Sequence, residues 1–377
     1  GSRQKNERKF YNKTIYLYCN KKWLDETKIP EGYSKWSKFS ETNEKNMIKL
    51  NNLINKIVDE RLKTYISRYN NYVEKNELDF LKSLDSEILK QEDYGDLVEL
   101  YESKLSLYGV SFLYDMFGEN DFKNSKMKVL YLSPSDLGLP TREYYLDEEF
   151  KDKRESYLEF IKLFSNYLDL RLNPEEILEF ETKLARLQMK PEEKRSPENI
   201  YFPTEVSVIE DKYQVPIHIY FEKLGKKPGK VICTNPKYFD NYLEGVSFDT
   251  LKQYFRYKLY LDFSRKSKGE LYNLYFNFYG RVLSGKKSKL PEWKRLLNMV
   301  DETLGELLSS EYIREYFSSE SKEEVSKMVE YFKKTIHEMI VSSDWMEDKT
   351  KSKALEKLDA IRYKIGYPNK FNPFDNL

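Results

Sequence analysis

The segment Asp344-Trp345-Met346-Glu347-Asp348-Lys349-Thr350 divides two amphipathic patterns near the end of the chain, and Ile365-Gly366-Tyr367-Pro368 follows the second of them. On each side of the segment, apolar residues recur three and four positions apart, which is the spacing of one helix face. They are Val325, Met328, Val329, Phe332, Ile336, Met339 and Ile340 before it, and Ala354, Leu358, Ile361 and Ile365 after it. Ser321 and Glu324 predict a capping box at the start of the first helix, and the Ile365–Pro368 turn is expected to end the second.

Helical spacing continues through most of the chain that precedes this segment. It predicts helices over residues 41–70, 77–90, 95–107, 109–118, 148–170, 174–188, 237–244, 248–266, 268–284 and 291–308. Residues 10–24 predict a short helix or an extended strap. The run from Met127 to Leu132 is β-prone and bounded by turns, so it predicts a strand. The fold class that follows is mainly α, a large multi-helix lobe with a few short strands.

Charge and hydropathy argue against two kinds of partner. Lys and Arg number 64 and Asp and Glu 63, so the formal charge of +1 offers no basic surface for nucleic acid or an anionic membrane. No apolar run in the sequence is long enough to span a bilayer. Gly1-Ser2 resembles a remnant of cloning, so the compartment stays open: a soluble cytoplasmic protein, or a secreted or cell-surface one with its anchor removed.

The tyrosine and cysteine residues do not indicate a particular reaction or metal site. The 32 Tyr residues are typical of an AT-rich genome, and the alternative is a peptide cleft lined by aromatic rings. Cys19 and Cys233 have no metal-ligand spacing, and isolated buried thiols are the favoured interpretation. Whether the two cysteines pair stays open.

The two histidines do not complete a catalytic motif. His337-Glu338-Met339-Ile340-Val341 has the first half of the HExxH zinc motif, in which two His on one helix face bind the metal and Glu acts as base. Val341 stands where the second His is required, so His337 is expected to be a solvated or core-edge side chain. His218 lies far away in the sequence, and no nucleophile motif surrounds either histidine. These residues alone name no reaction.

Several motifs, in a fixed order, resemble those of one family of peptidases. They are Tyr16–Leu24 with Ile29-Pro30, Leu137-Gly138-Leu139-Pro140-Thr141-Arg142-Glu143-Tyr144-Tyr145-Leu146, Glu181–Ala185, Met189–Arg195, Trp293-Lys294-Arg295, Glu320-Ser321-Lys322, Trp345-Met346 and Ile365–Pro368. Together they resemble the neprilysin, endothelin-converting enzyme and PepO family of zinc metalloendopeptidases, peptidase family M13. The resemblance covers about residues 10–370, and its specificity comes from the order and spacing of the motifs.

The resemblance implies two mainly α-helical lobes around a closed cavity that admits oligopeptides. It also implies a thermolysin-like catalytic lobe, C-terminal to Pro368, with HExxH, a downstream Glu as third zinc ligand and an Asn-Ala substrate-binding motif. None of these motifs occurs in the sequence, so the chain is expected to be the N-terminal portion, to bind no zinc and to be inactive alone. Residues 1–40 are expected to form a strap partly packed on the catalytic lobe, residues 41–365 the helical lobe, and residues 366–377 the start of the link.

One substrate-binding residue is implied by the same resemblance. Family members often have an arginine shortly after the Ile-Pro segment, and it pairs with the C-terminal carboxylate of the substrate. Lys35 matches that position after Ile29-Pro30. Lysine keeps the charge but lacks the bidentate fork of arginine, so carboxylate recognition would be weaker. A solvated surface lysine is the alternative.

Two functions stay open at this point. The first is the N-terminal part of a zinc metalloendopeptidase, whose partners are oligopeptide substrates and a catalytic lobe on the same polypeptide or a companion chain. The second is a non-catalytic peptide- or protein-binding module built from the helical lobe alone. The first predicts exposed apolar surface around Tyr16–Trp23 and at the end of the last helix, where the other lobe would pack.

Overall fold

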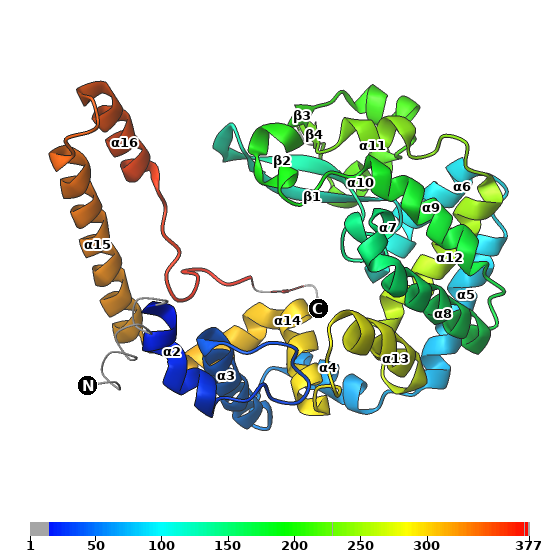
Figure 1. Cartoon of the computed structure of the whole chain (residues 1–377), viewed down its shortest axis with the longest axis horizontal. Coiled ribbons are helices and arrows are strands. Elements are labelled where there is room, and N and C mark those ends of the chain that lie inside the picture. Colours follow the sequence, from blue (N-terminus) through cyan, green and yellow to red (C-terminus); the bar gives the residue numbers. More distant parts are fainter. Residues whose placement is uncertain (1–14, 228, 373, 376–377) are drawn as a thin grey trace, which may run out of the picture. The chain divides into compact units, whose positions relative to one another are not determined.

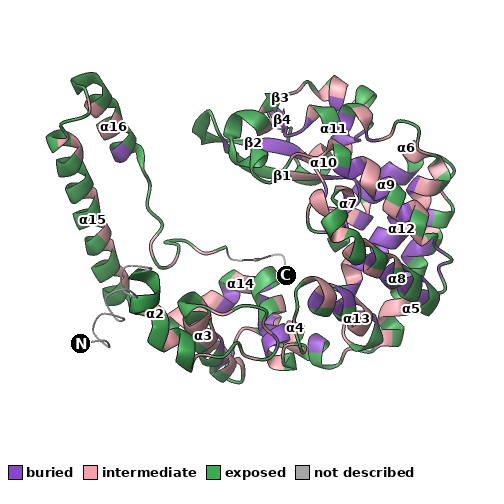
Figure 2. Cartoon of the chain, in the orientation of Figure 1, coloured by how far each residue is buried: buried purple, intermediate pink, exposed green. Residues whose placement is uncertain are grey.

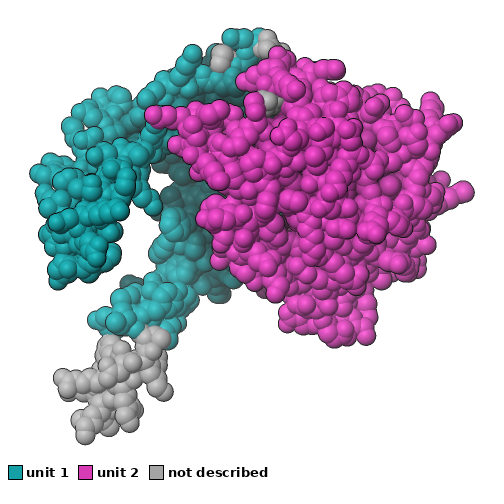
Figure 3. Space-filling view, turned by 90° about the horizontal axis from the view of Figure 1, so that it is seen from above, with its two compact units in different colours: residues 1–30, 35–72, 290–377 teal, residues 31–34, 73–289 magenta. Residues whose placement is uncertain are grey.

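The computed structural model describes residues 15–227, 229–372, 374 and 375, and its chain divides into two compact units. Residues 1–30, 35–72 and 290–377 belong to the first unit, and residues 31–34 and 73–289 to the second (Figure 3). Residues 10–14 of the predicted strap lie outside the described residues. The predicted domain boundaries at residues 40 and 365 concern attachment to a catalytic lobe, and they stay predictions.

The first unit is helical (Figure 1). Its helices are α2 (Ile15–Glu26), α3 (Lys38–Ile54), α4 (Glu60–Asn70), α14 (Glu292–Tyr316), α15 (Ser319–Ser342) and α16 (Asp348–Ala360). Helices α3, α4 and α14 share an apolar core formed by Met47, Ile57, Leu62, Tyr69, Leu296, Leu297, Val300, Leu304, Leu307 and Leu308. Helix α14 bends at Leu304, whose backbone is non-helical (φ −125°, ψ 31°).

The second unit combines helices with a small sheet. Its helices are α5 (Glu74–Leu89), α6 (Tyr94–Ser103), α7 (Glu143–Leu146), α8 (Lys151–Leu168), α9 (Pro174–Leu187), α10 (Ile217–Leu224), α11 (Pro236–Asn241), α12 (Phe248–Ser264) and α13 (Gly269–Tyr275). Short 3-10 turns cover Leu105–Tyr108, Glu148–Phe150, Glu193–Arg195 and Pro197–Ile200, and π-helical turns cover Val208–Lys212 and Phe276–Leu283. The strands are β1 (Tyr114–Asp121), β2 (Asn124–Pro134), β3 (Phe202–Pro203) and β4 (Val231–Cys233).

The strands form one mixed sheet in the order β1-β2-β4-β3. Strands β1 and β2 make an antiparallel hairpin in which Gly118 lies opposite Leu130. Strand β4 runs parallel to β2 and antiparallel to β3. Helices account for 64% of the residues, so the predicted class, mainly α with a few short strands, is confirmed.

Tyrosine supplies much of the core of the second unit, which appears as purple segments in Figure 2. Its largest fully buried side chains are Tyr114, Tyr131, Tyr157, Tyr238, Tyr242, Tyr254, Tyr257, Tyr260, Phe112, Phe164, Phe239 and Phe255. The rings of Phe112 and Phe255 stack with centroids 4.0 Å apart. Buried hydroxyls find acceptors, as when Tyr238 donates to the Leu113 carbonyl at 2.7 Å. These tyrosines therefore pack a core and do not line a peptide cleft.

Some predicted elements differ from the structure. The prediction of a helix over residues 109–118 is wrong, because the second half of this range lies in strand β1 and the first half is not helical. An Asx turn explains the hairpin: Asp121 Oδ1 accepts from the Lys123 N–H at 2.9 Å and reverses the chain into β2. The strand predicted at Met127–Leu132 is confirmed within β2.

The long helix predicted over residues 41–70 is two helices. Helix α3 ends at Ile54, and Asp59 caps α4 by accepting from the N–H groups of Arg61 and Leu62. Residues 95–107 and 268–284 each likewise divide into an α-helix and a turn of another type. The helix predicted over 291–308 continues to Tyr316.

The predictions for the start of α15 and for the end of α16 were wrong. Ser318, not Ser321, caps α15, and its hydroxyl accepts from the Ser321 N–H. Helix α16 ends at Ala360, so Ile361 and Ile365 lie in the segment that follows it. The Ile365–Pro368 turn therefore does not close the last helix, and its contacts belong to a different feature, described below.

Candidate functional site

Lys35 lies in the segment just before α3 and is exposed. Helix α3 begins three residues later at Lys38, and its N-cap Ser37 forms a reciprocal capping box with Ser40. Among the described residues, no carboxylate lies within ion-pair distance of the Lys35 ammonium. The Lys35 ammonium can therefore attract an anionic group by its charge, but it cannot form the bidentate contact that an arginine makes.

The described residues do not fit a zinc site. His337 is exposed on α15, as the sequence predicted for a solvated histidine, and Val341 stands one turn after it. The His218 Nδ1 lies 2.8 Å from Glu210 Oε1. Within residues 15–227, 229–372, 374 and 375, no three His, Cys, Asp or Glu side chains are grouped so that they could hold a metal ion.

Both cysteines are free thiols. Cys19 is exposed on α2, whereas Cys233 is buried on β4, so only one of the two predicted buried thiols is buried. Burial raises the pKa of the Cys233 thiol to about 12. A thiol this hard to ionise is a poor nucleophile, which argues against a cysteine mechanism at that position.

Two of the sequence motifs meet around one buried carboxylate. Glu181 on α9 is fully buried. Its Oε1 accepts from the hydroxyls of Tyr157 at 2.5 Å and Tyr145 at 3.2 Å. Its Oε2 accepts from the Gly138 N–H at 2.7 Å and the Tyr254 hydroxyl at 2.8 Å. One carboxylate thus accepts hydrogen bonds from all four of these groups, and it links the Leu137–Leu146 motif to helices α8, α9 and α12.

Glycine is required at position 138 by the same cluster. A Cβ there would lie 1.8 Å from the Tyr157 hydroxyl oxygen and 2.7 Å from its Cζ. Tyr157 cannot retreat, because it is buried and its hydroxyl also lies 2.8 Å from that of Tyr257. Burial, followed by the negative charge of Glu181, raises the pKa of Tyr157 well above its ordinary value. The tyrosines are therefore neutral donors, and the cluster fixes structure without providing an acid or base.

The Ile365–Pro368 motif fastens the base of the α15–α16 hairpin. Lys322 Nζ on α15 donates to the Tyr367 carbonyl at 2.6 Å and to Asn369 Oδ1 at 2.9 Å, and it lies 4.2 Å from the Tyr367 ring centroid. Gly366 has a left-handed backbone (φ +66°), and a Cβ there would come 2.7 Å from the Phe317 ring. We call this set of contacts the Lys322 clasp. It explains why Gly precedes Tyr367, and it positions the segment that follows.

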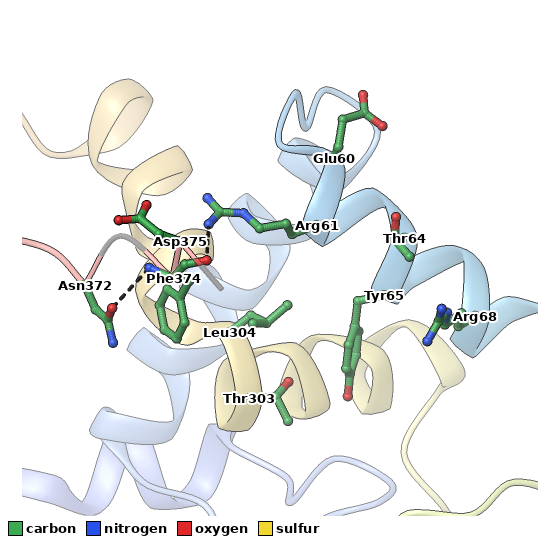
Figure 4. Close-up of a pocket in the computed structure, with 10 residues that line it drawn as sticks. All are labelled: Glu60, Arg61, Thr64, Tyr65, Arg68, Thr303, Leu304, Asn372, Phe374 and Asp375. Atoms are coloured by element: carbon green, nitrogen blue, oxygen red, sulfur yellow. Dashed lines mark hydrogen bonds between the residues drawn. The ribbon is translucent and has the colours of Figure 1, made fainter. Parts of the chain in front are cut away.

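A pocket of about 1010 Å³ lies in the first unit, between α4, the bend of α14 and the side chains of Asn372, Phe374 and Asp375 (Figure 4). Arg61 Nη2 pairs with Asp59 Oδ2 at 2.7 Å, and its Nη1 donates to the Phe374 carbonyl at 3.0 Å. The hydrogen bond from Arg61 holds the pKa of the Asp59 carboxyl below its usual range. Figure 4 shows Tyr65 and Leu304 directed to the same space from α4 and α14.

The pocket carries charged, polar and apolar side chains. Its lining, which includes Arg68, Thr64, Thr303, Glu60 and Asp375, has no His or Cys among the described residues. The exposed Arg68 makes no ion pair with a described residue. No sequence motif pointed to this pocket, since its walls come from distant parts of the chain and its Leu304 bend has no proline to mark it.

A family model with the description "Peptidase family M13" matches residues 14–368. The chain belongs to peptidase family M13. Endothelin-converting enzyme 1 of Bos taurus is 26% identical over 384 residues, which cover 94% of this chain and 51% of that relative. The family resemblance inferred from the motifs is confirmed, and the chain corresponds to the N-terminal portion of M13 proteins.

Solved M13-type structures have the same fold. Mycobacterium tuberculosis zinc metalloprotease Zmp1 in complex with an inhibitor superimposes with a TM-score of 0.86 at 21% identity, covering 96% of this chain and 58% of that one. PepO from Lactobacillus rhamnosis gives a TM-score of 0.82 at 18% identity, with coverage of 96% and 60%. M13 is a family of zinc metallopeptidases, and the chain spans about half the length of the curated relatives it matches. Among the described residues, no helix is long and apolar enough to cross a membrane.

Proposed function

We propose that this chain is the N-terminal part of a zinc metalloendopeptidase that cleaves oligopeptides inside a closed cavity, with its zinc ligands on a catalytic lobe outside this chain. The observation that carries the proposal is the family match over residues 14–368, combined with curated relatives about twice as long. The described residues include no group that could hold a metal ion, which is consistent with ligands supplied from elsewhere.

The domain roles follow from the same proposal. Residues 1–40 act as a strap on the catalytic lobe, residues 41–365 form the helical lobe, and residues 366–377 begin the link. The Lys322 clasp supports the last assignment, because it holds Tyr367 and Asn369 in place where the link begins. Apolar side chains predicted to be exposed around Tyr16–Trp23 are exposed, with Tyr16 at 63% and Tyr18 at 64%. Ile361 and Tyr363, after the last helix, are exposed as well.

The native gene product provides the test. Its intact mass, its zinc content and its cleavage of an oligopeptide before and after chelation should be measured beside those of this chain. We expect a longer polypeptide, or a companion chain, with stoichiometric zinc and chelator-sensitive cleavage, whereas this chain should lack both properties. A native polypeptide that ends near Leu377, without a companion chain, would overturn the proposal.

Lys35 is the proposed contact for the C-terminal carboxylate of the substrate. Its exposed ammonium, which pairs with no described carboxylate, supports this role. In the native peptidase, Lys35→Met should raise KM for a peptide with a free C-terminus roughly tenfold and leave KM for the amidated peptide unchanged, because only the charge contact is lost. Lys35→Arg should retain or lower KM. Lys28→Met, another exposed lysine, is the control, and equal effects on both peptides would contradict the role.

A second candidate is a peptide- or protein-binding module without catalysis. The pocket at α4 and α14, whose described lining includes apolar side chains and no His or Cys, favours this function. Peptide binding by this chain alone, without zinc and abolished by filling the pocket with Thr303→Trp, would support it. Zinc-dependent cleavage by the native gene product would rule it out.

A further inference from the structure

A second pocket, of about 350 Å³, lies in the first unit between α3, the second half of α14 and the Ile365–Pro368 motif. Its lining includes four aromatic rings and two carboxylates, from Tyr312, Phe317, Tyr367, Phe371, Asp301 and Glu306, and we call it the Asp301 pocket. No Lys, Arg or His belongs to the described lining. A volume at the lower end of the range for ligand sites suits a small molecule or a single side chain.

The two carboxylates come from opposite sides of the bend in α14. Asp301 precedes Leu304, whose backbone is non-helical, and Glu306 follows it. On a straight helix, side chains at these two positions would point roughly 140° apart, yet both line the same pocket. Gly305 leaves room for the first carboxylate, because a Cβ there would lie 3.2 Å from Asp301 Oδ1. Two negative charges are thus brought to one pocket at the bend.

These charges are not balanced by a cation of the described chain. Glu306 Oε2 accepts from the Asn372 N–H at 2.6 Å, but neither Glu306 nor Asp301 forms an ion pair with a described residue. Lys322, which contacts the Tyr367 ring in the clasp, is not among the lining side chains and pairs with neither carboxylate. The local field therefore attracts a cation from outside the chain.

The aromatic walls have the complementary chemistry. The rings of Phe317 and Tyr367 meet edge to face with centroids 5.6 Å apart, and those of Tyr367 and Phe371 are inclined by 22°. On the α3 side, the Tyr312 hydroxyl donates to Asn46 Oδ1 at 3.2 Å, which holds its ring in place. The faces of aromatic rings attract ammonium and guanidinium groups, and their apolar surface packs against the stem that carries such a group.

We propose that the Asp301 pocket binds an alkylammonium or guanidinium group, carried either by a free organic amine or by a Lys or Arg side chain of a peptide. This inference goes beyond the proposed function and does not depend on it. The two carboxylates disfavour an anion. A bare metal ion does not match the donor set, because no three His, Cys, Asp or Glu side chains are grouped to hold one among the described residues.

Calorimetric titration of this chain with butylammonium chloride tests the proposal. The matched probe is 1-butanol, which has the same apolar stem without the charge. We expect saturable binding of butylammonium, roughly tenfold tighter than that of butanol, because the carboxylates and ring faces act on the charge. Equal affinities, or no binding of butylammonium, would overturn the proposal.

Variants locate the binding. Asp301→Asn and Glu306→Gln should each weaken butylammonium binding roughly tenfold, and glutamine still offers an acceptor to the Asn372 N–H. Phe371→Leu should weaken butylammonium but not butanol, because it removes a ring face and keeps an apolar side chain.

Glu302→Gln is the matched control, since it removes the same charge from the next position of α14 and Glu302 does not line the pocket. An equal loss of affinity for Glu302→Gln and Asp301→Asn would overturn binding in the pocket. Unfolding temperatures show whether each variant folds. If Asp301→Asn does not fold, Glu306→Gln and Phe371→Leu decide the question.

A peptide probe identifies the source of the cation. A tripeptide with blocked ends and a single central lysine should be titrated beside butylammonium. Tighter binding of the peptide would assign the pocket to a protein or peptide side chain, and weaker binding would assign it to a free amine; both results support the site. The native gene product should bind butylammonium as this chain does. Loss of binding there would show that the pocket is covered in the native protein and would overturn the proposal.

Discussion

The Glu181 cluster and the α15–α16 hairpin use family motifs in opposite ways. At the cluster, the motif residues Gly138, Tyr145 and Glu181 are buried, and every polar group among them has a partner. At the hairpin, the ammonium group of Lys322 has its hydrogen-bond acceptors, but the side chains of Phe332 and Met339 on the same helix are exposed to solvent. The comparison teaches that the second unit closes its own core, whereas the hairpin of the first unit leaves apolar side chains exposed.

The largest expected effect is loss of the buried carboxylate. Glu181→Ala should lower the free energy of unfolding by about 3–5 kcal/mol, because buried tyrosine hydroxyls and the Gly138 N–H would lose their acceptor. Glu181→Gln, which keeps one carbonyl oxygen, should cost less. Chemical denaturation measures both, with the exposed Glu179→Ala on the same helix as control. A loss below about 1 kcal/mol for Glu181→Ala would contradict a closed, fully satisfied core.

The next effect is overpacking at the same cluster. Gly138→Ala should cost about 3 kcal/mol, since the new Cβ would collide with the buried Tyr157 ring. Gly118→Ala is the matched control, because no atom lies within 4 Å of its Cβ position. Equal unfolding temperatures for the two variants would show that the Leu137–Leu146 loop is not tightly packed.

A smaller effect is expected at the clasp. Gly366→Ala should cost about 1–2 kcal/mol from the left-handed backbone, and its contact with Phe317 adds to this. The effect should be local, so limited proteolysis after residue 360 should accelerate while the Glu181 cluster stays intact. Gly285→Ala has the same positive φ with open space around it and reports the backbone strain alone. Proteolysis that is unchanged by Gly366→Ala would mean that the motif does not fasten the hairpin.

The stability of the second unit should depend on pH through Asp121 in the β1–β2 hairpin. Tyr201 donates to Asp121 at 2.5 Å, and this bond, with those from the Lys123 N–H and Lys230, holds the pKa of the Asp121 carboxyl below its ordinary 3.8. A lowered folded-state pKa stabilises the fold above the unfolded-state pKa, and that stability is lost as the pH falls through the folded-state value.

Asp121→Asn should therefore destabilise the chain at pH 7, and the difference from wild type should shrink between about pH 5 and pH 2. Urea unfolding at each pH measures it, and the exposed Glu99→Gln on α6 should change little at either pH. A difference that is as large at pH 2 as at pH 7 would contradict a role for the ionised carboxylate.

The smallest effect on the unfolding free energy is expected at the exposed Phe332 of α15. Phe332→Ser should change the unfolding free energy of this chain by no more than about 0.5 kcal/mol, because the ring is already exposed. Phe164→Ser, in the closed core, is the contrasting variant and should be strongly destabilising. Strong destabilisation of this chain by Phe332→Ser would mean that the Phe332 ring is covered by other residues of the same chain.

The helices were predictable where their periodicity is local, and contacts across the chain were not. The apolar spacing of Val325 to Ile340 predicts α15 correctly, but spacing cannot tell whether a face is covered. Strand β1 was missed because Tyr114–Asp121 lacks clear alternation and depends on the Asp121 turn to pair with β2. The role of Glu181 depends on donors brought from three other segments, and only the family motifs hinted that the residue matters.

The native gene product tests the central claim most directly. Its zinc content and chelator-sensitive cleavage of an oligopeptide should be measured in parallel with those of this chain. The account predicts stoichiometric zinc and cleavage for the native protein and neither for residues 1–377 alone. Stoichiometric zinc with peptide cleavage by this chain alone would contradict it.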